Sequence, residues 1–185
     1  MVFYFLGGRQ KMSTKKMVLA ALFLALGLYL PFLTGQVPQI GSMLLPMHLP
    51  VLICGFVCGW PYGLAVGFIS PLLRTMLFGM PPFPMVAVPM AFELAAYGLL
   101  TGLLYKALPK QQPISIYLSL IGAMLGGRIV WGIVRYVMLL MGTPITWQAF
   151  LSAVLLTSIP GIILQIVLVP LVVLALERVG LIENV

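Results

Sequence analysis

Five ionisable side chains lie within segments that are otherwise almost entirely apolar: His48, Arg74, Glu93, Arg128 and Arg135. A charged side chain in the middle of a membrane costs about 2.5–3.5 kcal/mol on insertion scales, so such residues usually pair with one another, face a cavity or hold a ligand. Three of the five are arginines and only one is an acid. Because one carboxylate neutralises one arginine at most, we expect the surplus positive charge to belong to a polar pocket.

Arg128, Trp131 and Arg135 follow one another at intervals of three and four residues, which places them on one face of a helix. Arginine forks beside an aromatic plane can hold a flat polar molecule by hydrogen bonds and stacking. The alternative is structural: the arginines pair with Glu93 and with backbone carbonyls, and Trp131 packs between helices.

Two further polar side chains extend the candidate pocket. Tyr97 lies one helical turn after Glu93, and Gln165 follows Thr157 and Gly161 at intervals of four residues. A glutamine in hydrocarbon needs a partner, so Gln165 serves either as a contact between helices or as a ligand donor. Glu93 has the corresponding alternative of a purely structural ion pair.

His48 lies between Pro46 and Pro50, which free backbone carbonyls close to it. A lone histidine is more often a structural residue than a ligand, although we keep it as a candidate. The two cysteines, Cys54 and Cys58, are one turn apart on the same helical face, a spacing that suits packing and disfavours a disulfide. A zinc site would need more ligands than this chain offers nearby.

The composition explains why these polar residues are notable. Of the 185 residues, 62% are hydrophobic and 7% are charged, whereas soluble domains carry about 25% charged residues. A helix needs about 20 residues to cross a bilayer, so the sequence indicates a polytopic, all-α membrane protein. The net charge of +7 does not indicate nucleic-acid binding, because the lysines flank apolar runs.

Six transmembrane helices are expected, separated by segments rich in glycine, proline or polar residues. A tight turn at Trp60–Gly63 is expected to separate the second helix from the third. The predicted helices cover residues 17–33, 43–59, the segment from that turn to about 78, 85–105, 114–141 and about 150–176.

The basic residues at the helix ends predict the orientation, since cytoplasmic loops carry an excess of lysine and arginine. With six crossings they all fall on one side: Arg9, Lys11, Lys15, Lys16, Lys106, Lys110 and Arg178. We therefore expect a cytoplasmic N-terminal segment at residues 1–16, a membrane domain at 17–176 and a cytoplasmic tail at 177–185. Met12 is an alternative start, which would make residues 1–11 an upstream extension.

This orientation places the five ionisable residues in the outer half of the membrane or at its midplane, so the predicted pocket opens outward. The chain has no zinc-protease motif, nucleophile elbow, phosphate-binding loop or pair of intramembrane acids. We expect no catalysis, no cofactor and no metal. The alternative function is a small integral membrane enzyme that uses His48 and Glu93 as base and acid. A stand-alone ion-coupled carrier ranks below it, because no internal repeat is evident.

The chain resembles the substrate-binding S components of energy-coupling factor (ECF) transporters over nearly its whole length from Met12. The resemblance rests on the size, on the six predicted helices and on a set of short motifs. These are Lys15-Lys16, Ala21-x-x-x-Ala25, Met47-His48-Leu49-Pro50, Gly55, Gly59, Trp60-Pro61-Tyr62-Gly63, Pro71-Leu72-Leu73-Arg74 and Phe92-Glu93.

The resemblance implies a subunit of the bacterial cytoplasmic membrane that captures a vitamin or related nutrient and associates with a transmembrane coupling subunit and two ATPases. It implies that Ala21 and Ala25 dock on the coupling subunit, that residues 34–42 and 79–84 cover the pocket, and that the last three helices line it. Surplus arginine favours a carboxylate, a phosphate or an acceptor-rich ring. The chain is also similar to members assigned to vitamin B6-type compounds, which carry no fixed net negative charge and so do not follow from the surplus of arginine.

Overall fold

The computed structural model describes residues 14–33, 44–109, 112–142 and 159–182, and every regular element in these ranges is an α-helix. Five of the helices are long and apolar enough to cross a membrane, and α4 is a shorter apolar helix. The elements are α2 (Thr14–Leu33), α4 (His48–Cys58), α5 (Trp60–Phe78), α6 (Ala87–Ala107), α7 (Pro113–Leu140) and α9 (Ile159–Arg178).

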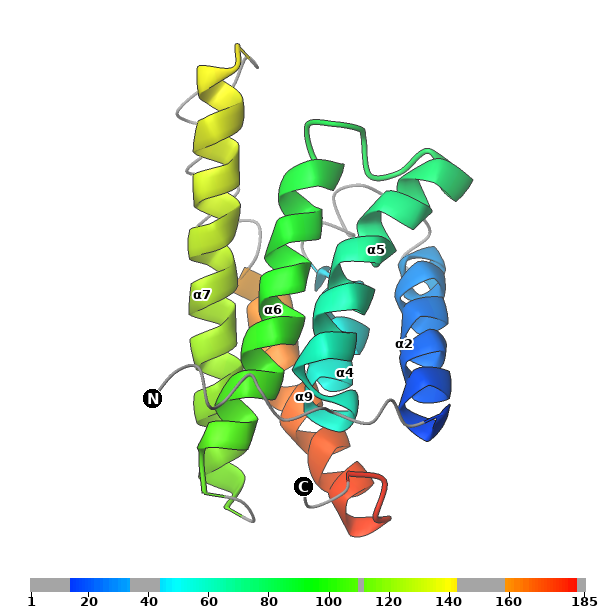
Figure 1. The fold of residues 1–185 in the computed structure, drawn as a ribbon, viewed down its shortest axis with the longest axis vertical. Helices are drawn as coiled ribbons and strands as arrows, with labels where there is room; N and C mark the ends of the chain where they lie inside the picture. The colour runs from blue at the N-terminus through cyan, green and yellow to red at the C-terminus, as the bar shows by residue number, and fades with distance from the viewer. Residues whose placement is uncertain (1–13, 34–43, 110–111, 143–158, 183–185) are drawn as a thin grey trace.

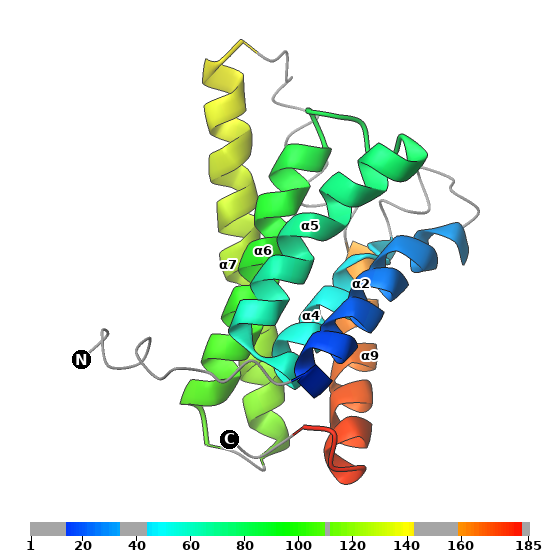
Figure 2. The same cartoon turned by 45° about the vertical axis from the view of Figure 1, so that its right-hand side comes forward.

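The helices form a bundle in which α6 is central, packed against α5, α7 and α4 (Figure 1). Helix α2 lies at one edge on α4 and α5, and α9 packs on α4 and α7. Both views show α5 leaning away from α7 toward its C-terminal end, while α7 extends beyond the start of α6 (Figure 2). The bundle therefore gives α6 protein neighbours on several sides, and its side chains supply the centre of the site described below.

The second predicted helix, at residues 43–59, is wrong as a continuous span. Helix α4 begins at His48 and has 11 residues, which at 1.5 Å per residue gives about 16 Å, well short of a bilayer core of about 30 Å. Pro46 lacks an N–H group, and Leu45 has a φ of 50°, so the chain cannot continue a helix through this point. All 11 residues of α4 are buried, which makes it part of the core.

The predicted turn at Trp60–Gly63 is also corrected. The chain reverses at Gly59, whose φ of 91° suits glycine, and Trp60 already begins α5. Pro61 lies in the first turn of α5, where its missing N–H group costs no helical hydrogen bond. Helices α2, α6 and α7 begin and end within about three residues of their predicted bounds, and α5 and α9 end within about two. The predicted start of the last helix, at about residue 150, lies outside the described residues.

Glycines bring α4, α5 and α6 into backbone contact. A Cβ atom on Gly98 of α6 would lie 2.1 Å from the carbonyl oxygen of Gly63, and one on Gly67 would lie 2.2 Å from that of Leu94. Gly63 and Gly67 on α5, like Gly98 and Gly102 on α6, are four residues apart, a spacing that allows such close packing. This close approach fixes α6 between its neighbours and so fixes Glu93, which α6 carries.

The basic helix ends gather at one end of the bundle. The start of α2, the end of α6, the start of α7 and the end of α9 lie there (Figure 1), and they carry Lys15, Lys16, Lys106 and Arg178. Several residues named above lie outside the described residues: Thr157, Lys110, the alternative start at Met12 and the expected covering segment 34–42.

Candidate substrate site

Glu93 is the hub of a buried polar cluster formed by three helices. The side chain of Glu93, on α6, is 4% exposed, and its Oε1 lies 3.2 Å from Nη1 of Arg128 on α7. The same oxygen accepts a hydrogen bond of 3.1 Å from the hydroxyl of Tyr97. The Oε2 atom lies 3.8 Å from Nε2 of His48 on α4, which is beyond hydrogen-bonding distance. The cluster thus joins four of the predicted site residues.

The surrounding packing holds these four side chains in place. Tyr97 is 1% exposed, and its ring meets the His48 ring edge-on with centroids 5.4 Å apart. Its other neighbour is Gly127, the residue before Arg128: a Cβ atom at this position would lie 2.0 Å from the Tyr97 ring. The missing side chain at Gly127 therefore lets α7 approach closely enough for Arg128 to reach Glu93.

Several buried polar atoms of the predicted site residues have no hydrogen-bond partner among the described residues. They are both ring nitrogens of His48, Nη2 of Arg128, Nε of Arg135 and both amide atoms of Gln165. Buried polar groups in folded proteins are normally paired, because leaving one unpaired costs about 1–3 kcal/mol. These atoms are thus available to a bound molecule or to water.

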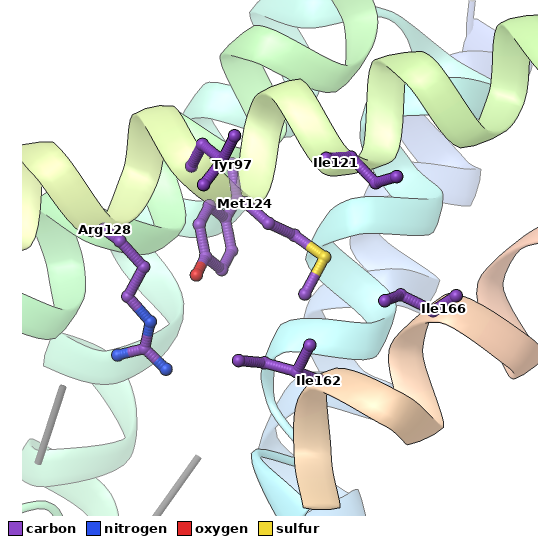
Figure 3. Close-up of a pocket in the computed structure, with 7 residues that line it drawn as sticks. Tyr97, Ile121, Met124, Arg128, Ile162 and Ile166 are labelled. Carbon is purple, nitrogen blue, oxygen red and sulfur yellow. The ribbon is translucent and has the colours of Figure 1, made fainter. Parts of the chain in front are cut away.

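A cavity of about 150 Å³ lies beside the cluster, between α6, α7 and α9. Tyr97, which lines the cavity, lies midway along α6, ten residues from each end, so the cavity is at mid-depth in the bundle. Figure 3 shows Arg128, Tyr97 and Met124 on one side of the space, with Ile162 and Ile166 opposite. The lining residues are Tyr97, Ile121, Met124, Leu125, Arg128, Ile162 and Ile166.

Arg135 and Trp131 share the face of α7 that the spacing predicts, but they do not line this cavity. Nη1 of Arg135 donates to the carbonyl of Met85 at 2.7 Å, just before α6, and its guanidinium lies 5.4 Å from the centre of the Trp131 ring. The structure therefore shows the expected alternative, in which an arginine of this face bonds to a backbone carbonyl. A ligand contact by either residue stays a prediction.

Arg74 lies apart from the cluster and faces α2. Its Nη1 donates to the carbonyl of Leu28 at 2.6 Å, and its guanidinium lies over the rings of Phe32 and Phe78. Gln165 is fully buried on α9 but is not among the residues that line the cavity. Among the predicted site residues, the structure thus brings together His48, Glu93, Tyr97 and Arg128.

Ala21 and Ala25 are exposed on α2, whose buried side consists of Ala20, Phe23, Gly27 and Pro31. Exposure is what docking requires, and docking itself stays a prediction. Cys54 and Cys58 are unpaired thiols buried within α4, in keeping with packing. In the part of the chain that the structure describes, no group of three or more metal-binding side chains comes together.

The sequence did not point to the apolar side of the cavity. Met124 and Ile162 look like any other apolar residues of a membrane helix, and no pattern distinguishes a cavity wall from a lipid-facing or packed side. One observation favours the enzyme alternative: Nε2 of His48 lies 3.8 Å from Oε2 of Glu93. The Glu93 carboxylate is nevertheless engaged by Arg128 and Tyr97.

Comparison with known proteins identifies a family. The family model described as "ECF transporter, substrate-specific component" matches residues 15–173, which leaves out only the first fourteen and the last twelve residues. No curated protein and no solved structure matches the chain.

Proposed function

The chain belongs to the family of ECF transporter substrate-specific components, and from this premise we propose that it captures a small water-soluble vitamin or related nutrient. It is a multi-pass protein of the cell membrane and a substrate-specific subunit of an ECF transporter. In the proposed cycle it passes its substrate to a transmembrane coupling subunit that is driven by two ATPases.

The buried cluster around Glu93 is the observation that carries the proposed binding site. Charged and polar side chains inside a chain of this composition are costly unless they serve one another or a ligand. Arg128 and Tyr97 line a cavity, Glu93 and His48 are buried next to them, and Nη2 of Arg128 has no partner among the described residues. Arg128 and Tyr97 are accordingly assigned to substrate contact, with Glu93 and His48 behind them.

The size and charge of the site support a single-ring, uncharged substrate. The pocket of about 150 Å³ is partly open, and an enclosed protein cavity of that volume holds one benzene ring, so its size favours a single ring over two or more fused rings. The charge of Arg128 is balanced by Glu93, so a ligand meets a donor rather than a net positive site. These features favour a vitamin B6-type compound over a multiply charged or multi-ring vitamin, with the ring against Tyr97 and an acceptor on Arg128.

The topology of the proposal follows the sequence. We retain six crossings with both termini in the cytoplasm, with the short helix α4 as the helical part of the second crossing. This topology places the basic helix ends inside, and the expected domain bounds of 1–16, 17–176 and 177–185 stay part of the proposal. The site then opens toward the outer side, with residues 34–42 and 79–84 over it. The exposed Ala21 and Ala25 form the docking site for the coupling subunit.

Equilibrium binding to the purified chain tests the proposal. Radiolabelled pyridoxine is expected to bind saturably and to be displaced by unlabelled pyridoxine, whereas riboflavin and folate in large excess do not displace it. Binding of riboflavin or folate with higher affinity would contradict the single-ring assignment. Failure of the chain to co-purify with a coupling subunit and ATPases would contradict the proposed assembly.

The enzyme alternative rests on the 3.8 Å approach of His48 Nε2 to Glu93 Oε2. It predicts that the purified chain converts a membrane-soluble substrate and that Glu93→Gln abolishes this turnover. The transport proposal predicts that a bound nutrient is recovered chemically unchanged after release from the protein, which mass spectrometry of the released compound decides.

A further inference from the structure

Arg74 joins the C-terminal ends of α2 and α5, away from the substrate cluster, and we call its contacts with Leu28, Phe32 and Phe78 the Arg74 clasp. The residue lies on α5 and is 4% exposed, and its Nη1 donates to the carbonyl of Leu28 on α2 at 2.6 Å. Its guanidinium lies 5.0 Å from the centre of the Phe32 ring and 5.5 Å from that of Phe78. The two rings meet edge-on at 4.9 Å, so the cation is enclosed by aromatic groups from both helices.

This clasp determines how α2 and α5 are placed relative to each other, in an interface that is otherwise mostly apolar. The buried positions of α2 are Ala20, Phe23, Gly27 and Pro31. In a membrane such surfaces associate weakly, because lipid tails are as apolar as the side chains they replace. Pro31 also removes one helical hydrogen bond in this turn of α2, and Arg74 bonds a carbonyl of the same turn. No carboxylate of the described chain pairs with Arg74, so the carbonyl and the rings are its recorded partners.

The clasp lies on the same stripe of α2 as the docking residues. Ala21, Ala25, Leu28 and Phe32 follow one another at intervals of four, three and four residues, which places them along one face of the helix. Ala21 and Ala25 are exposed, whereas Leu28 and Phe32 are partly covered where Arg74 and Phe78 meet them. A partner that holds the first half of the stripe therefore acts on a helix whose second half is fastened to α5.

The contact continues from α5 into the segment that leads to α6. Thr75, next to Arg74, donates from its Oγ1 to the carbonyl of Pro81 at 2.7 Å. Residues 79–86 connect α5 to α6, the helix that carries Glu93 and Tyr97. One path from the docking stripe to the substrate-bearing helix thus runs through the Arg74 clasp, beside the direct packing of α2 on α4.

We propose that Arg74 is a positioning residue that couples α2 to α5, so that movement of α2 on the coupling subunit is transmitted to the substrate-binding helices. In this role it does not contact the substrate. The inference rests on the proposed function for its consequence in transport, while the clasp itself can be tested on the isolated chain.

The experiment compares Arg74→Met and Arg74→Lys in the full chain. Methionine removes both the hydrogen bond and the cation, whereas lysine keeps the charge and loses the planar group that stacks on the rings. We expect pyridoxine affinity of the isolated chain to stay within about twofold, and uptake by the complete transporter to fall about tenfold in Arg74→Met, the change that about 1.4 kcal/mol of lost coupling produces. Arg74→Lys should retain an intermediate rate of uptake.

Phe68→Leu serves as the matched control. It removes the edge-on contact of Phe68 on α5 with Phe92 on α6 and leaves α2 untouched.

A distance measurement separates coupling from a general loss of structure. Spin labels at Tyr29→Cys and Met76→Cys, which are 62% and 84% exposed, report the separation of α2 and α5, and the native thiols Cys54 and Cys58 are buried. The distribution of label-to-label distances should be narrow in the parent and in Phe68→Leu, and broad in Arg74→Met.

A narrow distance distribution in Arg74→Met would overturn the clasp, and so would normal uptake by this variant. A tenfold loss of pyridoxine affinity with an unchanged distance would make Arg74 a ligand contact instead. If the parent transports nothing, the proposed function fails, and the label distances alone decide the clasp.

Discussion

Arg128 on α7 lies with its Nη1 atom 3.2 Å from Oε1 of Glu93 on α6. The pair joins the two helices beside the cavity, and it leaves Nη2 of the arginine without a partner in the described structure. One arginine thus serves two purposes: one nitrogen neutralises the buried acid and the other is available to a ligand.

Replacing Arg128 by methionine should impair both stability and binding. It leaves the Glu93 carboxylate buried without its cationic partner, and breaking a buried pair in this way costs roughly 3–5 kcal/mol. Thermal unfolding of the purified chain should occur at a lower temperature, and pyridoxine affinity should fall at least about tenfold with the loss of a charged donor.

The double variant Arg128→Met, Glu93→Gln separates these two effects. Once the acid is neutral, the stability lost in Arg128→Met should be partly recovered, because no buried charge is left unpaired. Pyridoxine affinity should stay low, since the donor is still missing. Recovery of both properties would show that Arg128 acts only through Glu93.

Gly127→Ala should disturb the site, and Gly132→Ala on the same helix should not. A Cβ atom at Gly127 would lie 2.0 Å from the Tyr97 ring, whereas one at Gly132 meets nothing within 4 Å. The forced separation of α6 and α7 should cost about 1–3 kcal/mol of stability and should move Arg128 away from Glu93. Pyridoxine affinity and thermal stability of the two variants check this, and equal behaviour would contradict the close packing.

Filling the cavity from α9 should abolish binding without unfolding the chain. Ile162→Trp projects into the space that Ile162 lines, whereas its neighbour Ile163 is 59% exposed and does not line it. We expect Ile162→Trp to lose pyridoxine binding and Ile163→Trp to bind like the parent. Binding isotherms decide the question, and intact binding by Ile162→Trp would place the substrate elsewhere.

The pairing of Glu93 with an arginine could be predicted from the sequence, because charge in a membrane helix is costly and acids are scarce here. The i, i+3, i+7 spacing correctly places Arg128, Trp131 and Arg135 on one helix face, but only Arg128 of the three lines the cavity. The spacing does not say which helix a face meets, so the contact of Arg74 with α2 could not be predicted. The late start of α4 depends on the positive φ of Leu45, which no residue type there requires.

Bulky substitutions on the docking stripe should separate transport from binding. Ala21→Trp and Ala25→Trp place a large ring on the exposed face of α2, which should block a closely packed partner and leave the distant Glu93 cluster intact. Leu26→Trp, on another face of the same helix, is the control. Uptake should be lost in the two alanine variants alone, while all three bind pyridoxine, and normal uptake by both alanine variants would exclude docking there.

Mass spectrometry can identify the small molecules that the gently purified chain retains. We expect a single-ring, uncharged nutrient that is recovered chemically unchanged from the parent and is absent from Arg128→Met. Recovery of a multi-ring or multiply charged compound, or equal retention of the same compound by Arg128→Met, would contradict the assignment of this cluster and cavity as the substrate site.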